Sequence, residues 1–358
     1  MRYISNVKNV TKHEYNPSVQ SLRGISILFV LLYHYFHNPN QGGALGVGLF
    51  FCISGYLITA ILLREFHKNG RIDFKRFYIR RARRLLPLAY LVIFLNFLVW
   101  FALNSFEYRL MDIRHLALSS IYSLFYVGNL FGYFGGSYTA LSEPLVPFWS
   151  LGVEEQFYVF WPLLLLILIG KIRQKYIYLF VIGLICASIF FHSFAQMAGK
   201  TVWTFPITYF DILFSGCLVA LLESKANFVI KPKLLGAIRL IGIFAALLIM
   251  CKGILPTDLF GQGYTLNFIM ELTIFLALYK SQLIAKSKFL KAMGDMSYSL
   301  YCIHYPVLTL GNSLLSDSSL RLPIVISLTF LLAFLSHKYY ERLFWTPSYL
   351  HKSTRMSE

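Results

Sequence analysis

Charged residues are scarce in this sequence, and acidic ones especially so. Asp, Glu, Lys and Arg together make up 14% of the 358 residues, with only 16 acids, whereas hydrophobic residues make up 57%. Soluble domains carry about a quarter charged residues, so this composition excludes an ordinary soluble protein. Because long apolar runs are typical of membrane-spanning helices, we predict an all-α, polytopic membrane protein.

The sequence also lacks the patterns that would connect its positive charge to nucleic acid. The formal net charge is +17, yet no helix-turn-helix, zinc-finger or aromatic RNA-binding pattern accompanies it. The five cysteines lie in or beside apolar runs without metal-type spacing, so we expect small core residues rather than disulfide partners. No signal peptide with a small-residue cleavage site is seen, which predicts that the first span is retained. Neither a nucleic-acid partner nor a metal site is expected.

Ten apolar runs are long enough, or nearly so, to cross a membrane. If the N-terminus is cytoplasmic, the expected inside segments hold 27 of the 33 lysines and arginines, and the outside segments hold five. This asymmetry follows the positive-inside rule and places both termini in the cytoplasm. The runs lie at roughly 19–37, 44–64, 85–104, 155–170, 176–193, 206–222, 234–251, 264–280, 297–315 and 322–340.

An eleventh apolar run, near 116–133, is not expected to cross. A crossing there would invert every later loop and place the basic loops outside, against the charge rule. We therefore expect a re-entrant or interfacial segment within a long external loop, 105–154. The expected organisation is one membrane-embedded domain over 1–345 and a short cytoplasmic tail over 346–358.

The first apolar run contains two ionisable residues, Arg23 and His34, in SLRGISILFVLLYHYFH. Ionisable groups at membrane depth are costly and usually functional. Eleven residues of helix return to within about 20° of the starting face, about 16 Å further along. The two side chains should therefore line one stripe that faces an internal site. A lone histidine is more often a satisfied core residue, so the functional interpretation depends on the other motifs.

An arginine cluster follows in the inside segment FYIRRARRLLP, with Arg80, Arg81, Arg83 and Arg84 at the start of the third span. Arg81 and Arg84 are three residues apart and share a helix face. Paired guanidinium groups suit bidentate binding of phosphate oxygens. Anchoring on anionic lipid is the alternative interpretation, with about even weight.

Two adjacent carboxylates, Glu154 and Glu155, lie in PFWSLGVEEQFYVFWP at the expected outer end of the fourth span. Ser150 is a candidate N-cap, and acids in a first helical turn complement the helix dipole. Capping could explain one glutamate, but two beside Tyr158 favour a site. Because adjacent helical residues point about 100° apart, we expect one of the two to face the interior.

A second intramembrane histidine, His304, lies in GDMSYSLYCIHYP near the start of the ninth run, and Pro306 should kink its helix. A packing role, with the ring bonded to a neighbouring helix, has equal weight with a functional one.

Taken in order, these segments resemble the acyltransferase-3 superfamily of integral membrane O-acyltransferases. The similar segments are SLRGISILFVLLYH, GVGLFFCISGYLIT, FYIRRARRLLP, WSLGVEEQFYVFWP and GDMSYSLYCIHYPV. The sequence departs from the family pattern at four positions. Gln20 and Gly48 stand where relatives often carry an acid, Pro147 where many carry histidine, and Tyr209 where arginine is common.

The resemblance implies a ten-helix membrane enzyme of the cell inner (plasma) membrane. It would transfer an acyl group, often acetyl, from cytoplasmic acetyl-CoA to a hydroxyl of an extracytoplasmic sugar or glycan. The family's motif histidine corresponds to His34 and its arginine to Arg23. The donor-binding arginines correspond to Arg81 and Arg84, with Arg80 nearby, and the motif glutamate to Glu154 or Glu155.

His34 would act as general base on the acceptor hydroxyl or carry the acyl group covalently, and the sequence leaves both mechanisms open. Ser150, Tyr158 and His304 are secondary candidates. The expected partners are membrane lipid and a glycan acceptor, and a homo-oligomer is compatible with the sequence. A secondary transporter of an anionic solute or lipid-linked sugar is the alternative function. The absence of a detectable inverted repeat counts against it.

Overall fold

The computed structural model describes residues 16–36, 43–105, 112–134, 141–197, 204–225, 233–238, 240–241, 244, 264–316 and 318–344. All regular elements within these ranges are helical, as predicted. The longer helices are α1 (Pro17–Phe36), α2 (Gly43–Asn69), α3 (Phe74–Ser105), α6 (Phe148–Lys171), α7 (Gln174–Met197), α8 (Phe210–Glu223), α10 (Tyr264–Leu278), α13 (Ser297–Leu314) and α14 (Arg321–Leu335). The shorter ones are α4 (Ile113–Leu124), α5 (Gly128–Phe134), η1 (Glu143–Leu145), η2 (Pro206–Tyr209), α11 (Gln282–Ala285), α12 (Lys288–Asp295), the π-helical η4 (Ser336–Tyr340) and α15 (Glu341–Phe344).

Among the residues that the structure describes, seven helical stretches are long and apolar enough to cross a membrane, which confirms a multi-pass membrane protein. They are Pro17–Phe36, Leu45–Asn69, Phe74–Ser105, Phe148–Lys171, Gln174–Ala195, Pro206–Glu223 and Arg321–Phe344. They correspond to the first six expected spans and the tenth.

The other three expected spans differ from these seven. The eighth contains a shorter apolar helix, Phe268–Leu278. The ninth coincides with α13, whose serines, histidine and asparagine lower its hydropathy. The seventh, 234–251, lies largely outside the described residues. Ten crossings and cytoplasmic termini therefore stay predictions.

The eleventh apolar run forms two short helices rather than one span. α4 has 12 residues and α5 has seven, whereas a crossing helix needs about 20. The chain breaks between them at Tyr126, whose φ of 54° lies in the left-handed region that non-glycine residues rarely adopt. The run therefore does not cross as a continuous helix.

The chain divides into two compact units, which we describe separately. Unit 1 comprises Met1–Asp73, Gln156–Val202 and Pro206–Gly294. Unit 2 comprises Phe74–Glu155, Trp203–Phe205 and Asp295–Glu358. The expected single domain over 1–345 remains a prediction, and the expected tail lies outside the described residues.

Close backbone packing between α2 and α8 forms the centre of unit 1. A Cβ at Gly55 would overlap the carbonyl of Leu213, and one at Gly216 would overlap the carbonyl of Cys52. Small residues allow helix backbones to approach closely in membrane proteins. The described cysteines are free thiols, and Cys251 lies outside the described residues. Cys52, Cys217 and Cys302 are buried, as expected of small core residues, whereas Cys186 is exposed, against the prediction.

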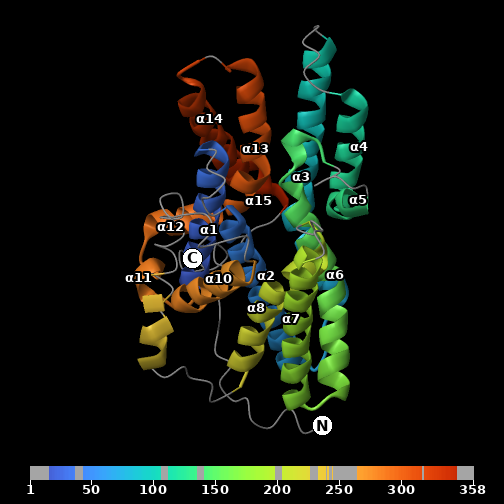
Figure 1. Ribbon diagram of the computed structural model, residues 1–358, viewed down its shortest axis with the longest axis vertical. Helices are drawn as coiled ribbons and strands as arrows, with labels where there is room; N and C mark the ends of the chain where they lie inside the picture. The colour runs from blue at the N-terminus through green and yellow to red at the C-terminus, as the bar shows by residue number, and fades with distance from the viewer. Residues whose placement is uncertain are drawn as a thin grey trace, which may run out of the picture. The chain divides into compact units, whose positions relative to one another are not determined.

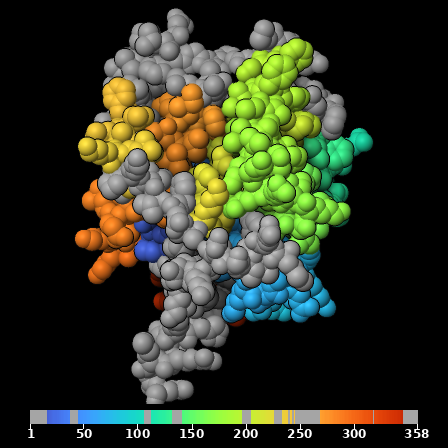
Figure 2. Space-filling view, turned by 90° about the horizontal axis from the view of Figure 1, so that it is seen from below, coloured from blue at the N-terminus to red at the C-terminus, as the bar shows by residue number. Residues whose placement is uncertain are grey.

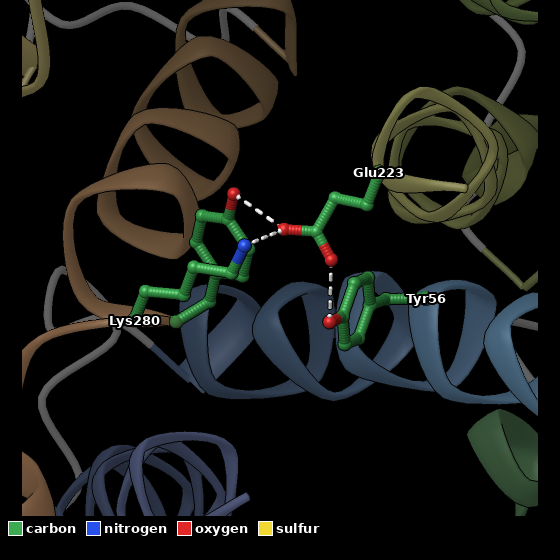
Figure 3. A network of polar contacts seen from close by, with 4 residues as sticks. Tyr56, Glu223 and Lys280 are labelled. Atoms are coloured by element: carbon green, nitrogen blue, oxygen red, sulfur yellow. Dashed lines mark hydrogen bonds and ion pairs between the residues drawn. The ribbon is translucent and has the colours of Figure 1, made fainter. Parts of the chain in front are cut away.

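The carboxylate of Glu223, at the end of α8, joins three helices of unit 1. It accepts hydrogen bonds from Tyr56 of α2 at 2.8 Å and from Tyr279, just after α10, at 3.0 Å, and it pairs with Lys280 (Figure 3). Glu223 is mostly buried, whereas Lys280 is about half exposed. A buried charge needs such partners to offset its lost hydration, so this network ties α2, α8 and α10 together.

The helix α7 shows the opposite character, because most of its surface is exposed and apolar. Leu179, Phe190 and Phe194 are each more than half exposed, and in Figure 2 α6 and α7 form one broad outward surface, drawn in light green. Apolar side chains on the outside of a spanning helix suit lipid tails. α2, by contrast, is mostly enclosed by protein.

Unit 2 is built from two pairs of neighbouring helices, α3 with α4 and α13 with α14 (Figure 1). α13 also packs against α3 and η1. The hydroxyl of Tyr90 on α3 donates to the carbonyl of Leu124 at the end of α4 at 3.2 Å. These contacts place the arginine-bearing half of α3, the loop helices and α13 in one unit.

Candidate active site

α1 carries both ionisable residues of the first span on one uninterrupted helix. Arg23 and His34 are half-buried, and helical geometry alone places them on one stripe, as predicted. The Nδ1 atom of His34 lies 2.9 Å from the carbonyl oxygen of Val30. Because a carbonyl only accepts, this contact places a proton on Nδ1, and in a neutral ring the lone pair is then on Nε2. This tautomer suits a base that works through Nε2.

The four arginines of α3 divide into two pairs by exposure. Arg81 and Arg84 are half-buried, whereas Arg80 and Arg83 are exposed. The division follows from the helical repeat, because Arg81 and Arg84 are three residues apart and therefore share one face of α3. Arg81 and Arg84 thus form the pair best placed to hold an anionic group away from bulk water.

Two tyrosines hold the backbone of α3 just after these arginines. Pro87 lies inside α3, where its missing N–H removes one helical hydrogen bond. Tyr298 of α13 donates to the carbonyl of Leu85 at 2.6 Å, and Tyr340 of η4 donates to the carbonyl of Pro87 at 3.2 Å. The segment that follows Arg84 is therefore fixed by side chains from two other helices.

The predicted N-cap role of Ser150 is wrong. α6 begins at Phe148, two residues earlier, because the turns after η1 lead directly into the helix. The hydroxyl of Ser150 instead donates to the carbonyl of Pro147 at 3.2 Å and lies 2.5 Å from the hydroxyl of Tyr301. Ser150 thus joins the start of α6 to α13.

Both glutamates of α6 lie near other groups of unit 2, and the expectation that one of the two faces the interior stays a prediction. Glu155 lies within electrostatic range of Arg81 and Tyr126, and Glu154 within range of Tyr301. Burial raises the pKa of Tyr126 well above its usual value, and the charge of Glu155 adds to this rise. Tyr126 therefore keeps its proton at neutral pH.

The sequence also placed the arginines and the glutamates at opposite ends of their spans, and the structure corrects this. Arg81 and Glu155 are close enough to interact. Arg81 is the eighth residue of α3 and lies about two turns, or about 10 Å, from the start of the helix. The start of α6 is packed tightly as well, because a Cβ at Gly152 would lie 2.6 Å from Asn129 Oδ1 and 2.9 Å from the carbonyl oxygen of Tyr126.

The two remaining secondary candidates have packing contacts. The hydroxyl of Tyr158 donates to Ser54 Oγ at 2.8 Å, which holds α6 against α2 within unit 1. His304 is fully buried, and its Nδ1 lies 3.0 Å and 2.8 Å from the carbonyl oxygens of Leu300 and Tyr301. These contacts anchor the ring to its own helix.

A carboxyl group lies beside Gly48, one of the departures from the family pattern. A Cβ at Gly48 would overlap the carboxyl group of Glu271 from α10. Glu271 is buried and lies within electrostatic range of buried Asp211. A carboxyl group from α10 thus lies directly against the backbone of α2 at Gly48.

Sequence reasoning missed Tyr126, Tyr298 and Tyr301, each of which lies within electrostatic range of Glu154 or Glu155. Tyr298 and Tyr301 share one face of α13 by their three-residue spacing, which is a signal visible in SYSLYCIHYP. Among the residues that the structure describes, no group of three or more His, Cys, Asp or Glu side chains could hold a metal ion.

Comparison with known proteins identifies relatives over nearly the whole chain. A family model described as an acyltransferase domain matches residues 16–338. The chain is 31% identical over 360 residues to the peptidoglycan O-acetyltransferase OatA of Listeria monocytogenes, covering 94% of this chain and 57% of that protein. It is 29% identical over 374 residues to the putative peptidoglycan O-acetyltransferase YrhL of Bacillus subtilis, covering 96% and 57%.

A third relative is the O-acetyltransferase OatA of Staphylococcus aureus, 31% identical over 349 residues, with 91% of this chain and 57% of that protein covered. The chain thus spans a little over half the length of the curated relatives that it matches. No solved structure matches it.

Proposed function

Because the chain belongs to the membrane acyltransferase family whose domain matches residues 16–338, we propose that it transfers an acetyl group from acetyl-CoA to a hydroxyl of a cell-wall glycan. The relatives named as peptidoglycan O-acetyltransferases support this acceptor class. The observation that carries the proposal is the half-buried pair Arg81 and Arg84, held on α3 beside a carboxylate.

The arginine pair would bind the anionic part of the donor. Guanidinium groups bind phosphate oxygens through two parallel, charge-assisted hydrogen bonds. Tyr298 and Tyr340 fix the backbone that follows the pair, which lowers the cost of holding both arginines in place. Arg80, on the exposed side, would add long-range attraction for the phosphates.

His34 would supply the base. Nε2 would take the proton of the acceptor hydroxyl as its oxygen attacks the thioester carbonyl carbon. The C–S bond then breaks, and the thiolate takes up the same proton to leave as the free thiol of CoA. The bond from Nδ1 to the carbonyl of Val30 holds the ring in the required tautomer. A covalent route, in which Nε2 carries the acetyl group first, uses the same atom.

The other polar groups would support these steps. Arg23, on the same stripe of α1 as His34, would orient the donor or hold a carboxylate charged. Glu154 and Glu155 would balance the positive charge that develops during transfer. Ser150 would act through Tyr301 by fixing the start of α6. The expected topology would let a cytoplasmic donor meet an extracytoplasmic acceptor.

The test is thiol release from acetyl-CoA by membranes that contain the protein, with and without added peptidoglycan strands. We expect release that depends on the glycan and that falls to background in membranes lacking the protein. Uptake of acetyl-CoA or glycan without thiol release would overturn the proposal in favour of a transporter. Release that is equal without any glycan would overturn the acceptor class.

A further inference from the structure

The short helices α11 and α12 expose apolar side chains although neither is long enough to cross a membrane. Leu283 is 82% exposed, the most of any large hydrophobic side chain among the described residues, and Phe289 is 60% exposed. Their neighbours Ile284, Ala285 and Met293 are buried. The segment therefore has one face on the protein and one apolar face turned away from it.

Lysines lie close to these apolar side chains in the sequence. The stretch from Tyr279 to the end of α12 contains four lysines and one acid, Asp295, which is the last residue of α12. Lys280 pairs with Glu223, which leaves three on the segment itself. Lys286 and Lys288 are exposed, and Lys291 is half-buried. An amphipathic segment with Leu and Phe on one side and lysines beside them is typical of a helix that lies in a membrane surface.

Packing against α1 places the segment at the level of a membrane surface. Ser18, in the first turn of α1, donates to the carbonyl of Ser281 at 3.1 Å. A Cβ at Gly24 would overlap the carbonyl of Leu290, and one at Gly294 would overlap that of Gln20. α1 is a candidate span that begins at Pro17, so Gly24 lies about 10 Å along it. Interfacial helices lie about 5–10 Å deep.

From these observations we propose that α11 and α12 form a binding surface for anionic phospholipid in the leaflet at which α1 begins. Leu283 and Phe289 insert at the boundary between headgroups and acyl chains, and Lys286, Lys288 and Lys291 bind the headgroup phosphates. Each cation near an anionic membrane surface strengthens binding roughly fivefold. A second copy of the chain fits less well, because a two-fold contact would bring the same lysines together.

The test uses the purified full-length protein in neutral detergent, titrated with phosphatidylglycerol or with phosphatidylcholine of the same acyl chains. Native mass spectrometry counts bound lipids and gives their affinities. We expect the wild type to prefer phosphatidylglycerol. The triple variant K286Q/K288Q/K291Q should lose roughly 100-fold in phosphatidylglycerol affinity at this surface, with phosphatidylcholine binding unchanged.

A matched control removes three exposed cations from the turn between α6 and α7, K171Q/R173Q/K175Q. This control variant should lose less than about threefold in phosphatidylglycerol affinity at the same lipid sites. The reason is that its three cations do not belong to the segment that carries Leu283 and Phe289. A second variant, L283S/F289S, should weaken the binding of both lipids. All of these residues are exposed except Lys291, which is half-buried, so the fold should survive, and thermal unfolding checks this.

Three outcomes would overturn the proposal. Full phosphatidylglycerol affinity in K286Q/K288Q/K291Q would show that these lysines do not bind headgroups. Equal loss in the control would show that binding follows total charge rather than this surface. The surface would belong to another occupant if it bound CoA instead of lipid in a way that required the lysines. The same would follow if the wild type formed a dimer and only K286Q/K288Q/K291Q failed to form it. None of these results depends on transfer activity.

Discussion

Glu223 in unit 1 and Glu155 in unit 2 show how differently one side chain can be used. Glu223 has three fixed partners, the hydroxyls of Tyr56 and Tyr279 and the ammonium group of Lys280. Glu155 instead lies within electrostatic range of Arg81 and of the hydroxyl of Tyr126. A carboxylate with fixed partners on three helices stabilises the fold, whereas one beside an arginine that we propose to bind phosphate can respond to a bound anion.

The largest effect on catalysis is expected from replacing the proposed base, His34 on α1, in a variant that keeps the fold. His34→Ala should lower kcat by about 10³-fold, within the range for loss of a general base. The rate of thiol release measures this. His192→Ala, a histidine of α7 in the same unit, is the matched control and should keep near wild-type activity. Comparable loss in both variants would indicate a folding defect rather than a lost base.

A second comparison separates the two faces of α3. Arg81→Ala should raise KM for acetyl-CoA by about 10- to 100-fold, because each charge-assisted hydrogen bond contributes about 1.5–3 kcal/mol. Arg83→Ala, on the exposed face, should change it by less than about threefold. Initial rates against acetyl-CoA concentration measure both. Similar KM values for the two variants would contradict the assignment of Arg81 and Arg84 to the donor site.

The tyrosines that hold α3 should have a smaller effect. Tyr298→Phe and Tyr340→Phe each remove one hydrogen bond near Pro87, which contributes about 0.5–1.5 kcal/mol. KM for acetyl-CoA should rise by about two- to tenfold while kcat stays close to wild type. Tyr90→Phe is the matched control, since it loses a similar bond from the same helix to Leu124. If Tyr90→Phe raises KM for acetyl-CoA as much, the result would contradict a specific positioning role for Tyr298 and Tyr340.

The smallest catalytic effect belongs to the network in unit 1. Glu223→Gln should leave kcat and KM within about twofold of the wild-type values. It should lower the thermal unfolding midpoint by about 2–5 °C, because one ion pair is lost and two hydrogen bonds are weakened. Lys280→Gln should lower the midpoint less, because Lys280 is half exposed and salt screens exposed pairs. A large loss of kcat in Glu223→Gln with an unchanged midpoint would give this carboxylate a role in catalysis.

Local signals in the sequence predicted most of the helices. Apolar runs located α1, α2, α3, α6, α7, α8 and α14, because a membrane requires continuous apolar helices of fixed length. The charge count also predicted that 116–133 does not cross, and the structure forms two short helices there. α13 has the weakest apolar signal of the long helices, because several of its residues are polar and make contacts within unit 2. Examples are the hydrogen bonds of Tyr298 and Tyr301.

The contacts between segments were less predictable. Spacing along α3 correctly paired Arg81 with Arg84, but no spacing indicates that Glu155 lies near Arg81, because tertiary packing brings α3 and α6 together in unit 2. The role of Ser150 was missed because a serine before a helical run fits an N-cap, whereas the turns before it had already started the helix. Glu271 beside Gly48 is likewise a contact between distant segments.

The measurement that tests the central claim most directly follows a labelled acetyl group from acetyl-CoA into peptidoglycan strands in membranes that contain the protein. The account predicts one alkali-labile acetyl ester on the glycan for each CoA thiol released, with both signals lost together in His34→Ala. Thiol release without ester on the glycan, or label delivered as free acetate, would contradict it.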